Sequence, residues 1–203
     1  MSGPAAPEQD HQHLAKNFVR SRRSQLRRGL ARPEWIMRTE PATNLRVLKP
    51  SRKKPKPGDV FALQLADEQY LFGRVISKDA KWTLAEGAGP AVLIYIYTDR
   101  SVDKTVPSPV LMRPDRLLVS PMMTNQLPWS HGYFETLANL PLAPGDVLPK
   151  HCFLSGSRGR YFDEYGAELP GPCEPVGDQG LHSFRTIDDQ ISDAAGVPRA
   201  RGE

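Results

Sequence analysis

Two neighbouring stretches in the first half of the chain, residues 60–65 and 70–76, are rich in the apolar residues typical of β-strands. Over residues 60–65 one face at a period of two carries Phe61, Leu63 and Leu65, and this is the period of a β-strand. Residues 67–68 have the composition of a turn, and residues 70–76 form a second mainly apolar run. The pattern predicts an antiparallel hairpin that begins a β-rich domain.

The longest apolar run, residues 91–97, contains no charged residue. Such a run predicts a strand that is buried on both faces. Shorter patterns predict further strands at 116–123, 132–137, 147–154 and 160–162. Near the end of the chain, the one-turn spacing of Ile187 and Ile191 predicts a short helix, which Thr186 would cap and Gly196 would end.

These elements predict an α+β fold, mainly an antiparallel β-sheet or a partly closed β-barrel, with a short C-terminal helix. We expect the domain to span residues 56–196 and residues 197–203 to form a tail. Residues 1–55 are expected to be a basic, largely disordered arm with a short helix in it. No run of 18 apolar residues occurs, so no transmembrane helix is predicted.

Charge divides the chain into two unlike parts. Residues 1–56 hold 14 Lys/Arg and 4 Asp/Glu, whereas residues 57–203 hold 13 and 19. A strongly basic arm would attract a polyanion such as nucleic acid through the release of counterions. The nucleic-acid candidates in the arm are Arg20, Arg22, Arg23, Arg27 and Arg28. A solvated basic tail without a ligand is the alternative, and composition does not separate the two.

The first residues lack the basic and apolar regions of a secretory signal, so we expect a cytoplasmic protein. Cys152 and Cys173 are its two cysteines. They could pair, but free thiols are expected in the cytoplasm.

No set of residues typical of an enzyme is present. There is no nucleotide-binding loop, no Ser/His/Asp arrangement and no pair of catalytic carboxylates at a recognisable spacing. His131, His151 and His182 are far apart in the sequence, which argues against a metal site. We therefore expect a protein without catalytic residues, metal or cofactor, and a hydrolase with an unrecognised site is the least favoured alternative. The sequence leaves the oligomeric state open.

Arg74 is the one charged residue inside the second strand of the hairpin. It could bind a carboxylate or phosphate of a partner. The favoured interpretation is structural, with an internal acid such as Asp59 or Asp163 as its partner, because charged groups inside strands are usually paired.

Two blocks of sequence stand out. The first is Lys56-Pro57-Gly58-Asp59-Val60-Phe61 together with Phe72-Gly73-Arg74-Val75-Ile76. The second is His151-Cys152-Phe153 together with Tyr161-Phe162-Asp163-Glu164-Tyr165-Gly166. Both blocks resemble the immunity protein 26 family of bacterial polymorphic toxin systems. The resemblance covers residues 54–190 and leaves the basic arm without an explanation.

The resemblance implies a non-enzymatic cytoplasmic protein that binds and neutralises a cognate toxin domain, often a nuclease. The acidic balance of residues 57–203 agrees with that role, since an acidic surface is complementary to a basic nuclease. Turns combine carboxylates with tyrosines, so the expected toxin-binding residues are Asp67, Glu68, Tyr70, Asp163, Glu164 and Tyr165. The alternative function is nucleic-acid binding through the basic N-terminal arm.

Overall fold

Two β-sheets make up most of the protein in the computed structural model, which describes residue 3 and residues 42–200. The larger sheet has the strand order β10-β4-β3-β2-β1-β5, and the smaller has the order β8-β7-β6-β9. The strands of the larger sheet are β1 (Asp59–Gln64), β2 (Tyr70–Ala80), β3 (Ala91–Ser101), β4 (Met122–Thr124), β5 (Glu135–Asn139) and β10 (Leu181–His182). Those of the smaller are β6 (Cys152–Ser155), β7 (Arg160–Phe162), β8 (Glu168–Leu169) and β9 (Val176–Asp178).

Most strand pairs are antiparallel, which confirms the predicted fold class. The parallel pairs are β10 with β4 and β6 with β9. Both sheets are open, because neither has its first strand paired with its last. Two arrangements were predicted, an antiparallel sheet or a partly closed barrel, and the structure has the open, mainly antiparallel sheet.

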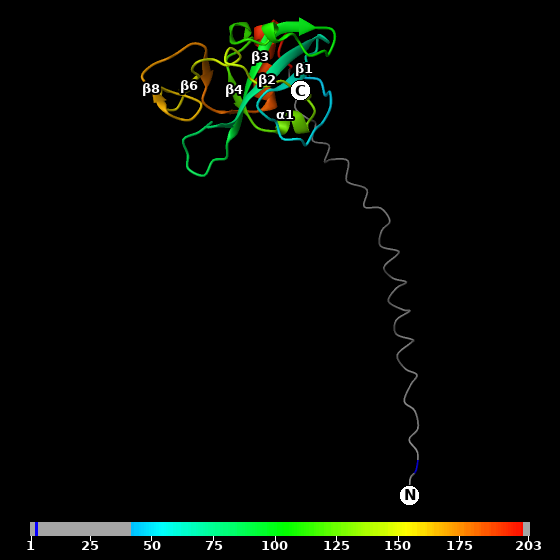
Figure 1. Ribbon diagram of the computed structural model, residues 1–203, viewed down its shortest axis with the longest axis horizontal. Helices are drawn as coiled ribbons and strands as arrows, with labels where there is room; N and C mark the ends of the chain where they lie inside the picture. The colour runs from blue at the N-terminus through cyan, green and yellow to red at the C-terminus, as the bar shows by residue number, and fades with distance from the viewer. Residues whose placement is uncertain (1–2, 4–41, 201–203) are drawn as a thin grey trace. The chain divides into compact units, whose positions relative to one another are not determined.

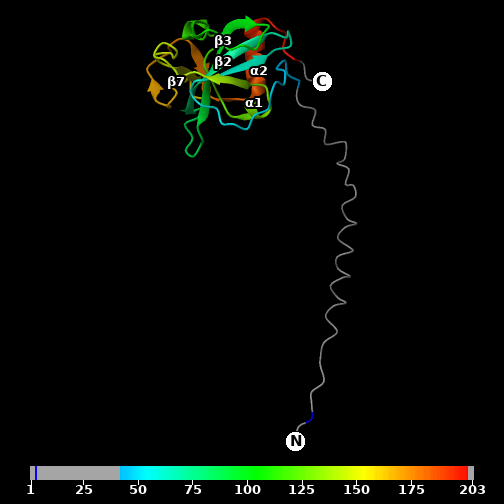
Figure 2. The ribbon, with the colours of Figure 1, turned by 45° about the vertical axis from the view of Figure 1, so that its right-hand side comes forward.

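The predicted central strand, β3, is buried on both faces of the larger sheet. On one face Ile94 and Ile96 pack with Phe61 of β1 and with residues of two helices, α1 (Leu127–Ser130) and α2 (Phe184–Ala195). On the other face Leu93 and Tyr95 pack with Phe153 of β6. Figure 1 shows the smaller sheet, in yellow and orange, to one side of β2 and β3, and Figure 2 shows α2 beside β2. The apolar run 91–97 is explained by these two covers.

Gly73 on β2 makes room for the ring of Phe61 on the neighbouring strand β1. A Cβ atom at this position would collide with the ring of Phe61 and would lie 2.6 Å from the carbonyl oxygen of Tyr95. The Phe61 ring in turn stacks on Phe134, with 4.5 Å between the ring centroids. A residue without a side chain at position 73 is therefore required by packing.

Residues 42–56, which we call the strap, lie along the domain. Leu45 is buried in the core beside α2. The backbone N–H groups of Leu48 and Ser51 donate to the carbonyl oxygens of Gly132 and Trp129 at 2.8 and 2.9 Å. The sequence assigns this segment to the arm, whereas in the structure it is bound to the domain. Residues 1–2 and 4–41 lie outside the described residues.

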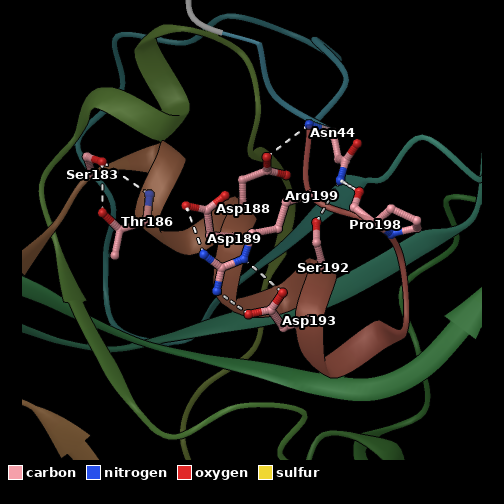
Figure 3. Close-up of polar contacts among 9 residues, drawn as sticks. All are labelled: Asn44, Ser183, Thr186, Asp188, Asp189, Ser192, Asp193, Pro198 and Arg199. Atoms are coloured by element: carbon pink, nitrogen blue, oxygen red, sulfur yellow. Dashed lines mark hydrogen bonds and ion pairs between the residues drawn. The ribbon is translucent and has the colours of Figure 1, made fainter. Parts of the chain in front are cut away.

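A buried carboxylate on α2 holds the beginning of the strap. Asp188 is 2% exposed, and it accepts hydrogen bonds from the backbone N–H groups of Asn44 at 2.9 Å and Leu45 at 3.1 Å. The Asn44 side chain donates to Ser192 on the same helix and to the carbonyl oxygen of Pro198 (Figure 3). Burial raises the pKa of Asp188 above its ordinary value of 3.8, and the two N–H donors oppose that rise.

Helix α2 differs from its prediction at one end only. It begins one turn earlier than expected, and its N-cap is Ser183, whose hydroxyl oxygen accepts from the backbone N–H of Thr186 at 3.2 Å. The expected cap, Thr186, is therefore wrong, because it lies inside the helix. Ile187 and Ile191 are buried in the core, and Gly196 ends the helix with a φ of 72°, as predicted.

The weaker strand predictions are correct only in part. Of residues 116–123, only Met122 and Met123 belong to a strand, β4; Arg116 ends the 3₁₀ turn Pro114–Arg116, and Leu117 makes an isolated bridge to Tyr97. Residues 147–154 become strand only from Cys152 onward. Within residues 42–200, no helix is long and apolar enough to cross a membrane.

Replacing Asp188 by alanine should destabilise the protein. The substitution leaves two strap N–H donors without their acceptor at a buried site, which costs about 2–3 kcal/mol in the free energy of unfolding. Urea denaturation at neutral pH measures this loss. The control is Asp189→Ala on the next, partly exposed position of α2, for which we expect less than about 0.5 kcal/mol. Equal effects of the two substitutions would show that Asp188 does not fasten the strap.

Candidate functional site

The first of the two predicted acidic turns joins β1 to β2. Asp67 lies 3.2 Å from Arg100 of β3, and Arg100 also donates to the carbonyl oxygen of Ala195 at the end of α2. Glu68 is exposed and has a φ of 64°, and Tyr70 is half-buried at the beginning of β2. This turn thus presents two carboxylates and a tyrosine near the C-terminal end of α2.

The second acidic turn follows β7 and is held by its own side chains. Asp163 Oδ1 accepts from the backbone N–H groups of Tyr165 at 2.9 Å and Ala167 at 2.8 Å. The carbonyl oxygen of Glu164 accepts from the N–H of Lys81 at 2.8 Å. Tyr165, in contrast, has 62% of its surface exposed. The turn is therefore a fixed support for one outward-facing aromatic side chain.

The two turns do not form one surface. The first lies at the beginning of β2, next to Tyr70, and the second contacts Lys81, just beyond its end at Ala80. At about 3.3 Å per residue, eleven strand residues separate them by about 30 Å. The predicted toxin-binding residues therefore fall into two groups, at opposite ends of one long strand.

Glu164 points into the protein, toward a buried histidine. Its Oε1 lies 2.9 Å from Nδ1 of His151, and Nε2 of His151 lies 2.6 Å from the hydroxyl of Tyr95. The backbone N–H of Leu148 donates to the same hydroxyl at 3.1 Å. Each ring nitrogen of His151 therefore has a polar side chain within reach, the Glu164 carboxylate at Nδ1 and the Tyr95 hydroxyl at Nε2.

The environment of this network fixes the charge of its members. Burial raises the pKa of Tyr95 well above its usual value of 10, so the hydroxyl is protonated at neutral pH. Burial by itself would raise the pKa of Glu164, but the hydrogen bond from His151, a backbone hydrogen bond and the charge interaction with His151 together outweigh it and hold that pKa below its usual 4.5. The ionised Glu164 and the protonated Tyr95 both contact His151, which is 2% exposed, and these contacts connect the two sheets. We interpret the network as structural.

Arg74 is buried and is bound within the protein. It is 2% exposed, its Nη1 lies 3.0 Å from Oδ2 of Asp146, and its Nη2 donates to the carbonyl oxygens of Leu140 and Pro141. The favoured interpretation, an internal acid partner, is correct in kind. The two acids named for it are wrong: Asp59 binds Asn139 and the N–H of Lys56, and Asp163 belongs to the turn after β7.

Neither cysteine forms a disulfide in the structure. Cys152 and Cys173 are both free, and the N–H of Cys173 donates to the sulfur of Cys152 at 3.2 Å. Among the residues that the structure describes, no group of three or more His, Cys, Asp or Glu residues could hold a metal ion.

The strap changes the charge of the folded part. Residues 46–56 contain six Lys/Arg and no Asp/Glu, so residues 42–200 hold 18 of each kind and are not acidic overall. Four of these lysines, Lys49, Lys53, Lys54 and Lys56, line a groove beside β5. Sequence reasoning missed this group because it assigned residues 1–55 to a largely disordered arm. The arginines at positions 20, 22, 23, 27 and 28 lie outside the described residues.

Comparison with known proteins gives one match. The family model described as Immunity protein 26 matches residues 56–161, which include β1 to β6 and most of β7. This matched segment covers the hairpin, Arg74, the central strand and His151, but ends before the turn that carries Tyr165. No curated protein and no solved structure matches the chain.

The pairing of Glu164 with His151 should make stability depend on pH. Because the folded-state pKa of Glu164 is lowered, its contribution is present above its usual pKa of 4.5 and is lost as the pH falls through the lowered value. Glu164→Gln should therefore reduce the free energy of unfolding at pH 7, and the deficit should shrink toward pH 3. Urea denaturation of both proteins across this range measures it. The control is Glu168→Gln on exposed β8, and a deficit independent of pH would contradict the assignment.

Arg74→Ala should destabilise the protein strongly, because it leaves Asp146 and two carbonyl oxygens without their donor. We expect a loss of about 3 kcal/mol, the lower end for breaking a buried pair, since Asp146 keeps 16% side-chain exposure. Thermal and urea unfolding provide the measurement. Arg158→Ala, at an exposed site in the β6–β7 hairpin, is the control. A folded Arg74→Ala protein of unchanged stability would show that the buried pair is unnecessary.

Proposed function

Because the chain belongs to the immunity protein 26 family, we propose that it binds a cognate toxin domain of a polymorphic toxin system and neutralises it. The single observation that carries this proposal is the family match over residues 56–161. In the proposed mechanism the protein acts without catalysis, as a one-to-one inhibitor in the cytoplasm. A nuclease is the proposed class of toxin.

The turn after β7 is the proposed main contact. Interface energy is concentrated in a few aromatic and charged side chains, and tyrosine is among the most frequent. Tyr165 combines 62% exposure with a backbone that Asp163, Lys81 and the His151 contact of Glu164 hold in place. A side chain on a support that is already rigid loses less conformational freedom on binding. Tyr165 is therefore the best-placed anchor among the predicted residues.

The other predicted residues have different parts in the proposal. Asp163 and Glu164 orient the turn through internal contacts and support Tyr165 indirectly. Asp67, Glu68 and Tyr70 form a second patch about 30 Å away along β2. This separation is close to the full width of a standard interface, so a toxin domain centred on Tyr165 would reach the other patch only at its rim, and we propose that the patch around Tyr70 is secondary.

The proposed preference for a nuclease rests on local charge. Residues 42–200 have no excess of acids, so steering of a basic toxin would come from the carboxylates near the turns and not from the domain as a whole. The alternative function, nucleic-acid binding by the arm, concerns residues outside the described part and stays a prediction. Two results would support that alternative. Oligonucleotide binding by the full chain should fall steeply with added salt, and a protein without residues 1–41 should not bind the oligonucleotide.

Tyr165→Ala should weaken binding to the toxin domain encoded beside this chain by at least about 1–2 kcal/mol without lowering the melting temperature. Calorimetric titration gives the affinity, and survival of cells that co-express the toxin gives the biological effect. Val110→Ala is a matched control, because Val110 has a similar exposed fraction, 63%, on a 3₁₀ turn.

A second variant locates the interface. Glu68→Lys reverses a charge in the other turn and should change the affinity less than Tyr165→Ala does. Stronger loss from Glu68→Lys would move the interface to the beginning of β2. Absence of any binding by the unmodified protein would refute the proposed function.

A further inference from the structure

A groove of about 750 Å³ runs between the strap and β5. The strap contributes Lys49, Lys53, Lys54 and Lys56 to one side, and β5 contributes residues 135–139 to the other. This volume lies in the range of roughly 300–1,000 Å³ that is usual for ligand clefts. All four lysines are exposed, so the groove is a basic surface.

The strap holds these lysines on a fixed backbone. The N–H of Ser51 donates to Trp129, and the N–H of Lys56 donates to Oδ2 of Asp59 at 2.9 Å. The side chain of Gln126 donates to the carbonyl oxygens of Arg52 and Lys53 at 2.9 and 3.2 Å. Gly132 permits close approach, since a Cβ there would lie 2.8 Å from Pro50. The positive charges are therefore preorganised beside the strand.

The other side of the groove is the edge of a sheet. β5 is the last strand of the larger sheet and pairs with β1 on one side only. An edge strand offers N–H and C=O groups that pair with the backbone of an extended peptide. Leu137 and Ala138 add apolar surface to the lining, so the groove can accept alternating apolar and charged side chains.

We propose that this groove binds an extended acidic segment of the toxin domain, which adds to β5 as a further strand and places its carboxylates against the strap lysines. The inference rests on the proposed function, because its occupant is part of the toxin. With this groove, the toxin would contact a basic site in addition to the acidic turns.

A peptide fits the groove better than a nucleic acid does. Sites for single-stranded nucleic acids combine basic grooves with aromatic side chains on which bases stack, and the lining residues of this groove include no aromatic one. The groove also contains Asp59 and Glu135, which would repel a chain with a phosphate at every nucleotide. An acidic peptide can place its carboxylates only where lysines face them.

Protection of the sheet edge is the other explanation for the lysines. Proteins often prevent edge-to-edge aggregation with charges on the edge strand itself. Here the four lysines come from the strap, and the charged residue of β5, Glu135, is bound to Lys104 at 2.6 Å. The lysines therefore face the groove from a separate segment, as they would for a ligand between the two.

The test compares two double variants with the same change in net charge. Lys53→Glu with Lys54→Glu reverses the groove, and Lys78→Glu with Lys150→Glu reverses two exposed lysines elsewhere. With the toxin domain as the probe, we expect the groove variant to lose at least about tenfold in affinity and the control less than about threefold. Melting temperatures check that both variants fold.

A second measurement does not depend on any variant. Hydrogen exchange of the unmodified complex should show new protection of the β5 backbone, residues 135–139. Absent protection, or equal affinity of the two double variants, overturns this inference while leaving the proposed function intact. An unmodified protein that fails to bind the toxin overturns both. A groove variant that loses affinity for a single-stranded oligonucleotide but not for the toxin also overturns the inference.

Discussion

Burial of β3 on both faces is the constraint on which the rest of the structure depends. A strand with apolar side chains on each face needs two separate covers. The helices and the segment before β5 supply one, and the smaller sheet supplies the other. Arg74 carries the only charge of its strand into this interior, and the segment 140–146 folds over it with an acid and two carbonyl oxygens. The segment 140–146 is therefore held on this face of the larger sheet by charge as well as by the apolar contacts of Leu140 and Leu142.

The same need to satisfy buried polar groups shapes the proposed contact surface. His151 is enclosed between the sheets, and both of its ring nitrogens find partners, one on β3 and one on the turn after β7. The turn is thereby fixed to the core, although it lies near the end of the smaller sheet. The backbone of the exposed Tyr165 is therefore held in place as well. A residue with no role in packing thus depends on the interior for its orientation.

Local patterns predicted much of the fold. The β1–β2 hairpin, the buried strand β3 and the end of α2 at Gly196 follow from period, apolar content and a glycine with positive φ. Interactions between distant residues could not be predicted in this way. Asp146 as the partner of Arg74, the inward orientation of Glu164 and the docking of the strap all depend on contacts across the fold. The sequence assigns the strap to the disordered arm because its anchors are mainly backbone groups, which composition does not reveal.

The bond between Asn44 and Asp188 has a consequence for the order in which the protein is made. The two residues are 144 positions apart, so the ribosome needs on the order of ten seconds to produce the acceptor after the donor. During that interval the segment around Leu45 has emerged, but the helix that buries it has not yet been translated. The native position of the beginning of the strap, residues 44–45, can therefore form only near the completion of synthesis, whereas the partners of residues 48–56 are made earlier. A nascent chain interrupted before α2 would carry every strand of the larger sheet and the anchors of the strap lysines, and yet Asn44 and Leu45 would have no carboxylate to donate to.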